Sequence, residues 1–184
     1  MASVSGAIVF TDLVGFTEFT AASGYDEAVR LLALQDHIVS TLLPDDARIV
    51  KELGDGLMIY FAEACHAVAT MLDVLDAFTA AGDREEMPLW VRVGAHWGCP
   101  TVRGADLVGH DANVAARVAD VAAPGELLVS EALVTADPHG GVAFGELGPV
   151  MMKGLPEAVS LFRAERDPLT PVRDAAAGLV TSRE

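Results

Sequence analysis

The sequence predicts an α+β domain with a largely antiparallel sheet, and two observations lead to this class. Apolar runs of strand length alternate with longer stretches whose apolar residues recur at helical spacing. Their order is strand, helix, two strands joined by a tight turn, helix and strand. This is a ferredoxin-like βαββαβ core, followed here by additional C-terminal strands and a helix. The 184 residues suffice for one such domain, with the helices expected on one face of the sheet.

The expected elements have recognisable boundaries. In order they are a strand at 6–12, a helix at 25–43, a hairpin at 47–61, a helix at 62–82, a strand at 89–98, a short arm at 101–104 returning alongside that strand, a helix at 111–122, and strands at 126–130, 142–148 and 158–165. The first strand is continuously apolar, as is typical of the centre of a sheet. Pro44, Gly82 and the pair Pro124-Gly125 end the three helices. Asp55-Gly56 is a favoured two-residue hairpin turn, with Asp55 as its first residue.

Composition limits the partners and the compartment. The formal net charge of −15 would repel a nucleic-acid backbone, which argues against that class of partner. We find no signal peptide and no apolar run near the roughly 18 residues that cross a bilayer, so a cytoplasmic domain without a membrane segment is expected. Cys65 and Cys99 lack metal-knuckle spacing and are expected to be buried free thiols. Periodicity stops at Asp167, which predicts a domain at 1–166 and a poorly ordered tail at 167–184.

Three charged residues stand at unusual places in the expected hairpin and central strand. Asp12 ends the buried strand, which is costly unless a basic side chain or a metal lies nearby. Side chains alternate along a strand, so Lys51 should share a face with Ile49 and Leu53. The alternative is a lysine on an edge strand whose charged end reaches solvent. Turn chemistry alone can explain Asp55. If the hairpin tip lies beside the end of the central strand, however, Asp12 and Asp55 converge, and paired aspartates favour Mg²⁺.

The helix at 111–122 carries a further polar pair. Asn113 and Arg117 are four residues apart and therefore share a face. Its buried stripe is expected to comprise Val114, Val118 and Val121. An Arg117–Asp120 surface ion pair is the alternative role for the arginine.

Two other positions are notable near this helix and beyond it. Asp106 precedes the helix by a short turn, where an acid is ordinary. Ten of the twelve basic residues are arginines, so Lys51 and Lys153 stand out as the two lysines.

Together these residues lie in motifs that resemble the class III nucleotidyl cyclases, the catalytic domains of adenylyl and guanylyl cyclases, and in particular the compact bacterial, mycobacterial-type adenylyl cyclases. "FTDLVGFT" is similar to the first metal motif of that family. "KELGDGLM" is similar to the motif with the base-reading lysine and the second metal ligand, and "DLVGHDANVAARV" to the segment with the second base-reading residue and the transition-state pair. The resemblance covers about residues 5–165.

The resemblance implies a metal site and a base site. Asp12 and Asp55 would hold two divalent ions, Mg²⁺ or Mn²⁺, with the Leu13 carbonyl completing one coordination sphere. Lys51 and Asp106 would read the purine edge, because adenine accepts at N1 and donates at N6.

The resemblance also implies contacts to the ribose and the phosphates. Asn113 would hold the ribose, Arg117 would meet charge on the α-phosphate, and Lys153 would contact the triphosphate. The turn after the first strand would bring backbone N–H groups to the β- and γ-phosphates at Gly15, Phe16 and Thr17.

The implied activity is an adenylate cyclase, which converts ATP to 3′,5′-cyclic AMP and pyrophosphate by two-metal-ion catalysis. The implied assembly is a homodimer, with metal ligands from one chain and base and transition-state residues from the other, and with the region 96–104 at the interface.

Three alternatives remain open. A nucleotide-binding module could keep the fold without turnover, and a structural α+β domain could carry incidental charges. A diguanylate cyclase type is disfavoured because the hairpin contains "LGDGL" in place of a "GGDEF"-like turn.

Overall fold

The architecture comes from a computed structural model, which describes residues 2–137 and 141–167. Its elements are β1 (Gly6–Leu13), α1 (Phe16–Ser23), α2 (Tyr25–Leu42), β2 (Ala47–Leu53), β3 (Gly56–Phe61), α3 (Ala64–Asp83), β4 (Val91–Gly98), β5 (Thr101–Arg103), β6 (Asp106–Val108), α4 (His110–Val121), β7 (Leu127–Ser130), α5 (Glu131–Ala136), β8 (Val142–Val150) and β9 (Val159–Arg166). Of the predicted tail, 168–184 lies outside the described residues.

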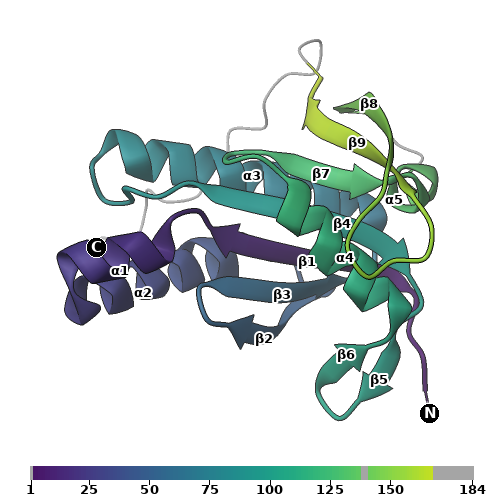
Figure 1. The fold of residues 1–184 in the computed structure, drawn as a ribbon, viewed down its shortest axis with the longest axis horizontal. Helices are drawn as coiled ribbons and strands as arrows, with labels where there is room; N and C mark the ends of the chain where they lie inside the picture. The colour runs from purple at the N-terminus through teal and green to yellow at the C-terminus, as the bar shows by residue number, and fades with distance from the viewer. Residues whose placement is uncertain (1, 138–140, 168–184) are drawn as a thin grey trace, which may run out of the picture.

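The main sheet has seven strands in the order β2-β3-β1-β4-β7-β9-β8 (Figure 1). The first four strands are antiparallel to their neighbours and have the order of a ferredoxin-like core. β7 then joins β4 as a parallel strand, and β9 and β8 continue the sheet in antiparallel pairing. The predicted α+β class, with its largely antiparallel sheet, is therefore confirmed.

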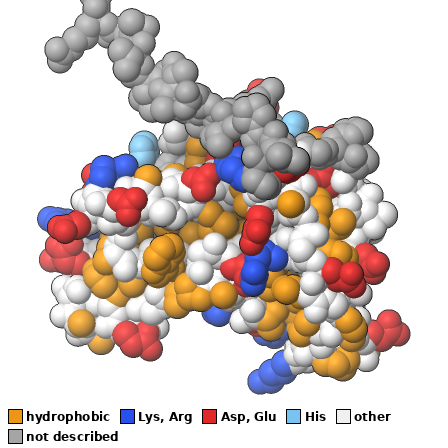
Figure 2. Space-filling model, turned by 90° about the horizontal axis from the view of Figure 1, so that it is seen from above, with side chains coloured by type: hydrophobic (Ala, Val, Ile, Leu, Met, Phe, Trp, Pro, Cys, Tyr) orange, Lys and Arg blue, Asp and Glu red, His pale blue; other side chains and the backbone are white. Residues whose placement is uncertain are grey.

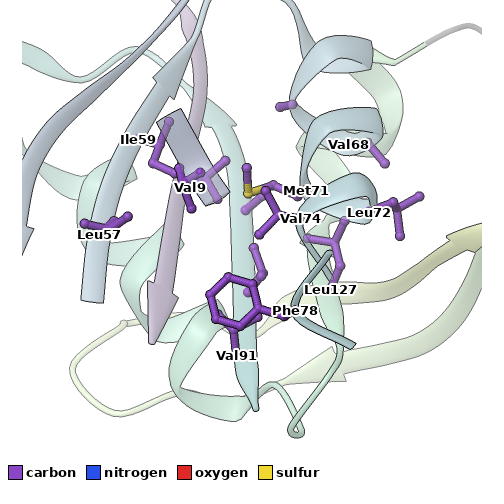
Figure 3. Close-up of a cluster of buried hydrophobic side chains, with 14 of the residues drawn as sticks. Val9, Leu57, Ile59, Val68, Met71, Leu72, Val74, Phe78, Val91 and Leu127 are labelled. Atoms are coloured by element: carbon purple, nitrogen blue, oxygen red, sulfur yellow. The ribbon is translucent and has the colours of Figure 1, made fainter. Parts of the chain in front are cut away.

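Helices cover both faces of this sheet, so the expectation of a single helical face is wrong. On one face, α2, α3 and α5 pack on the strands in a cluster that includes Val9, Ile59 and Val91 (Figure 3). On the opposite face, α4 packs its alanines against Ile8 and Met58. The reason lies in β1, whose continuously apolar sequence is buried on both sides, so each face needs its own cover.

Several element boundaries also differ from the sequence prediction. α1 and α5 were not located, because eight and six residues are too few to show a helical period. The arm at 101–103 pairs with β6 rather than with β4, and forms a separate two-stranded sheet. Gly104, with φ +64°, makes the tight turn that this small hairpin requires.

Two side chains predicted to be buried lie at the surface. Val121 is 44% exposed because α4 ends there, and Ala122 takes its place in the apolar cluster beneath. Cys99 is exposed where the chain leaves β4, and Cys65 is half-buried. Both thiols are free, as expected.

The charges on the surface and the apolar sequence of α3 concern contact with nucleic acid and with a membrane. Acidic and basic side chains are mixed with apolar ones on the face shown in Figure 2, and its visible part carries no continuous basic patch. α3 is long and apolar enough to pass a simple length-and-composition test for a membrane span. Half of that stretch is buried inside the domain, however, as is usual for the core helix of a globular protein.

The packing of α4 on β4 yields a prediction. A Cβ built at Gly94 would lie 2.0 Å from the backbone nitrogen of Ala119, so the helix and strand touch without side chains between them. We expect Gly94→Ala to lower the free energy of unfolding by about 1–3 kcal/mol through overpacking. Urea denaturation measures this, with Gly145→Ala as the control, since its Cβ would meet nothing nearer than 3.9 Å. Equal stability of the two variants would contradict the contact.

Candidate active site

Asp12 and Asp55 come together at the end of β1. The hairpin tip lies directly against this end, because a Cβ at Gly56 would stand 2.5 Å from the Thr11 carbonyl oxygen. The Leu57 amide donates to Thr11 Oγ1 at 3.2 Å and fixes the same approach. Burial raises the pKa of Asp55, and the negative charge of Asp12 raises it further. The two carboxylates are therefore close enough to repel each other.

A divalent cation fits this pair. Burial is the main cause of the raised pKa of Asp55 and the charge of Asp12 adds to it, so a cation between the carboxylates would favour their charged forms. The described residues contain no group of three or more His, Cys, Asp or Glu side chains suited to a metal. Two carboxylates with water and phosphate oxygens are the usual ligands of Mg²⁺, which needs no larger protein cage.

The turn that carries Asp55 is shifted by one residue from the prediction. Leu53 pairs with Gly56, so the two turn residues are Gly54 and Asp55, and Asp55 is the second. Gly54 has φ +71°, as the first position of a type II′ turn requires. The "GDG" sequence is compatible with either pair, and the strand register decides between them.

Lys51 lies on the opposite face of the sheet from the one predicted. Ile49 pairs with Ile59 but Lys51 pairs with Met58, so Val50 is an extra, bulged residue. The bulge turns Lys51 away from the face of Ile49 and toward that of α4. Lys51 and Leu53 still share a face of the sheet, as predicted, and both line the same pocket.

This reversal brings Lys51 to Asp106, the first residue of β6. The Lys51 Nζ lies 2.8 Å from both carboxylate oxygens. The hydrogen bond from Lys51 is the main reason that the pKa of Asp106 is lowered. Two residues far apart in sequence thus present a donor and an acceptor side by side.

An apolar pocket of about 270 Å³ is lined by Lys51 and by Leu107, the neighbour of Asp106, but not by Asp106 itself. It is lined by Phe10, Lys51, Leu53, Met58, Leu107, Val108, Gly109, Ala112, Asn113 and Ala116. Apolar walls beside a donor and an acceptor suit a heterocyclic base. Asn113 joins the pocket from α4, whereas Asp12, Asp55 and Arg117 are not part of its lining.

Arg117 makes the ion pair that was its alternative role. Its Nη1 donates to Asp120 Oδ2 at 2.6 Å, three residues along α4. The arginine side chain is 44% exposed, so the pair is open to solvent. An exposed pair of this kind contributes little to stability and leaves the guanidinium free to exchange partners.

The remaining predicted residues lie on separate parts of the chain. Leu13 is the last residue of β1 and its side chain is buried in the core. Gly15, with φ +82°, precedes α1, and no side chain caps this helix end, so the first N–H groups of Phe16 and Thr17 have no capping partner. Lys153 is exposed in the β8–β9 connection, away from any hydrogen bond or ion pair within the described part of the chain.

Arg92 is the basic partner of Asp12 that sequence reasoning missed. The two residues pair across β1 and β4, and Arg92 Nε and Nη2 approach Asp12 Oδ2 at 2.8 and 2.6 Å. Arg92 Nη1 also donates to the Asp120 carbonyl at 3.2 Å, which links β1 to the end of α4. The signal was an arginine within the apolar alternation "VRV", at the register position opposite Asp12.

His96 is a second residue that the sequence did not single out. It lies on the same face of β4 as Arg92 and Gly94, beneath the start of α4. Its Nδ1 is 2.7 Å from Ser130 Oγ, and its Nε2 is 3.5 Å from Asp111 Oδ1. Burial lowers the pKa of His96, and the Asp111 carboxylate opposes that shift.

Comparison with known proteins gives one family. The adenylate and guanylate cyclase catalytic domain matches residues 3–164. The pH-sensitive adenylate cyclase MT1302 of Mycobacterium tuberculosis is 30% identical over 86% of this chain and 40% of its own length. An adenylate cyclase of Streptomyces griseus is 32% identical over 67% of this chain and 30% of its own. The chain thus spans less than half the length of these relatives.

Solved structures share the fold. The adenylyl cyclase CyaB of P. aeruginosa superposes with a TM-score of 0.78 at 18% identity, over 91% of this chain and 97% of that one. The guanylyl cyclase Cya2 superposes with a TM-score of 0.77 at 20% identity, over 88% and 92%. At these identities the likeness concerns the fold.

The partly buried His96 predicts that the free energy of unfolding depends on pH. Because its pKa is below 6.5 in the folded state, the unfolded chain binds the proton first, and stability falls as the pH drops below that value. We expect the free energy of unfolding of His96→Asn to vary less with pH than that of wild type between pH 7 and 5. The two slopes should differ by at most about 1.4 kcal/mol per pH unit. Urea denaturation across this range gives both profiles. Parallel profiles would show that His96 does not titrate differently on unfolding.

Proposed function

The chain belongs to the family of adenylate and guanylate cyclase catalytic domains, and from this premise we propose that it is an adenylate cyclase that forms 3′,5′-cyclic AMP and pyrophosphate from ATP. The observation that carries the proposal is the approach of Asp12 and Asp55 on the end of β1, where two acids favour a divalent cation. We assign residues 1–166 to the catalytic domain and place its reaction in the cytoplasm, where ATP is available.

Asp12 and Asp55 would hold the two divalent ions, with the Leu13 carbonyl as a further ligand. When bound, the ions lower the pKa of the ribose 3′-hydroxyl and stabilise the leaving pyrophosphate. The 3′-oxygen attacks the α-phosphorus in line, and no side chain is assigned as general base. The N–H groups of Phe16 and Thr17, at the start of α1 where no side chain caps the helix, would contact the outer phosphates, and Lys153 would add a positive charge.

Asn113 and Arg117 act on the sugar and the reacting phosphate. Asn113 holds the ribose, and its position in the lining of the base pocket supports this role. Arg117 leaves Asp120 and stabilises charge on the α-phosphate, a role that is worth about 10³–10⁵ in rate where an arginine finger supplies it. Its exposed, exchangeable ion pair supports this role.

The Lys51–Asp106 pair selects the base. Lys51 donates to N1 of adenine, and Asp106 accepts from its N6 amino group. Guanine reverses this edge, so its O6 acceptor would face the Asp106 carboxylate, and its N1–H donor would face the Lys51 ammonium. The pair therefore favours ATP over GTP, and its short contact supports the assignment because donor and acceptor are already side by side.

Two half-sites on one chain support a homodimer with shared sites. The carboxylates of Asp12 and Asp55 do not line the pocket that holds Lys51 and Asn113. We propose that the metal half-site of one chain meets the base half-site of its partner, with the β5–β6 arm at the interface. A two-fold dimer then has two equivalent sites.

The first test is product formation. Purified protein with ATP and Mn²⁺ should release cyclic AMP and pyrophosphate, whereas GTP should give much less cyclic product. Asp12→Asn should lower the rate at least about 10²-fold, because it weakens metal binding while preserving shape. Chromatography of the nucleotides measures both. ATP binding without turnover would leave a nucleotide-binding module as the function.

Shared sites predict complementation. Asp12→Ala and Arg117→Ala should each be inactive alone, but a mixture should regain up to about a quarter of the wild-type rate. This is expected because half of the dimers are mixed and one of their two sites is intact. Cyclic AMP formation after mixing at equal concentration measures the recovery. A mixture as inactive as its components would place each complete site within one chain.

A further inference from the structure

Gln35 is a polar residue in the apolar stripe of α2. The buried residues of this helix are Ala28, Leu31, Gln35 and Val39. Gln35 is only 1% exposed. Its Oε1 has no hydrogen-bond partner within the described parts of the chain. A buried amide oxygen without a hydrogen-bond partner is unfavourable, so an apolar residue at this position would stabilise the core more.

Among the described residues, the side chain of Gln35 makes a hydrogen bond that reaches the hairpin tip. Its Nε2 donates to the Asp55 backbone carbonyl at 3.2 Å. Asp55 lies in a two-residue turn beside Gly54, whose φ of +71° is the left-handed conformation that glycine favours. The bond therefore connects the turn of the hairpin to a helix of the main core.

This bond completes the support of the Asp55 backbone. Gly56 packs on the Thr11 carbonyl on one side of the turn, and Leu57 donates to Thr11 Oγ1 just beyond it. Those contacts tie the hairpin to β1, and Gln35 ties it to α2. The three contacts hold the Asp55 carboxylate near Asp12 before any cation binds.

We infer that Gln35 is a positioning residue, which fixes the Asp55 turn and so prearranges the divalent-cation site at the expense of core stability. The inference rests on the proposed function, because it assumes that Asp12 and Asp55 bind the cation. A ligand held in place in advance loses less conformational freedom on binding, which strengthens the affinity. Gln35 touches neither the substrate nor the cation.

The test separates cation affinity from stability. Gln35→Met keeps the length and shape of the side chain but removes both polar groups. We expect Mn²⁺ to bind this variant about tenfold more weakly than wild type, measured by electron paramagnetic resonance of free Mn²⁺ without nucleotide. The melting temperature should be equal or higher, because the unmet oxygen is gone. A role in folding alone would lower the melting temperature and leave the affinity unchanged.

Two controls make each outcome decisive. Leu31→Met alters the same stripe of α2 away from Asp55, and should leave Mn²⁺ affinity as in wild type. Asp55→Asn should abolish the binding that depends on this site. Equal affinity in Gln35→Met and wild type, or a Gln35→Met protein that unfolds, would overturn the role of Gln35 alone. If wild type and Asp55→Asn bind Mn²⁺ equally, the proposed metal site fails, and the inference fails with it.

Discussion

The pairing of β1 with a strand on each side is the constraint on which the site depends. β3 fixes the hairpin tip beside the end of β1, and β4 places Arg92 across from Asp12. The positions of Asp12, Asp55 and Arg92 therefore follow from the register of β1 with β3 and of β1 with β4. A shift of one residue in either register would send the paired side chains to the other face of the sheet.

The acidic pair at this end of the sheet is balanced by a neighbouring arginine and not by the charge of the chain as a whole. The chain carries a formal net charge of −15, yet the acidic pair is accompanied by one guanidinium that also bonds the Asp120 carbonyl. The positive charge of Arg92 thereby offsets the free-energy cost of an aspartate at the end of a buried strand. It also joins the acidic pair to the end of α4, where Arg117 and Asp120 lie. A cation that binds Asp12 competes with this arginine.

The sequence was enough to predict the fold class and to select most of the candidate site, because periodicity and motif spacing are local properties. It could not place Lys51, since the bulge at Val50 depends on how β2 pairs with β3 and leaves no mark in the alternation. Arg92 was missed for the same reason: its role appears only when β4 lies against β1. α1 could not be predicted because its eight residues are too few to show a helical period, and Gly15 before it is equally typical of a turn.

The bulge at Val50 has a counterpart at the far side of the sheet. β2 and β8 are its two edge strands, and β8 is also irregular, between Glu146 and Gly148. Bulged edges twist away from a straight hydrogen-bonding row and resist pairing with another strand. A second copy of the chain therefore cannot readily lengthen this sheet. Association between copies is then expected to use surfaces other than the edge strands, such as the β5–β6 arm proposed above.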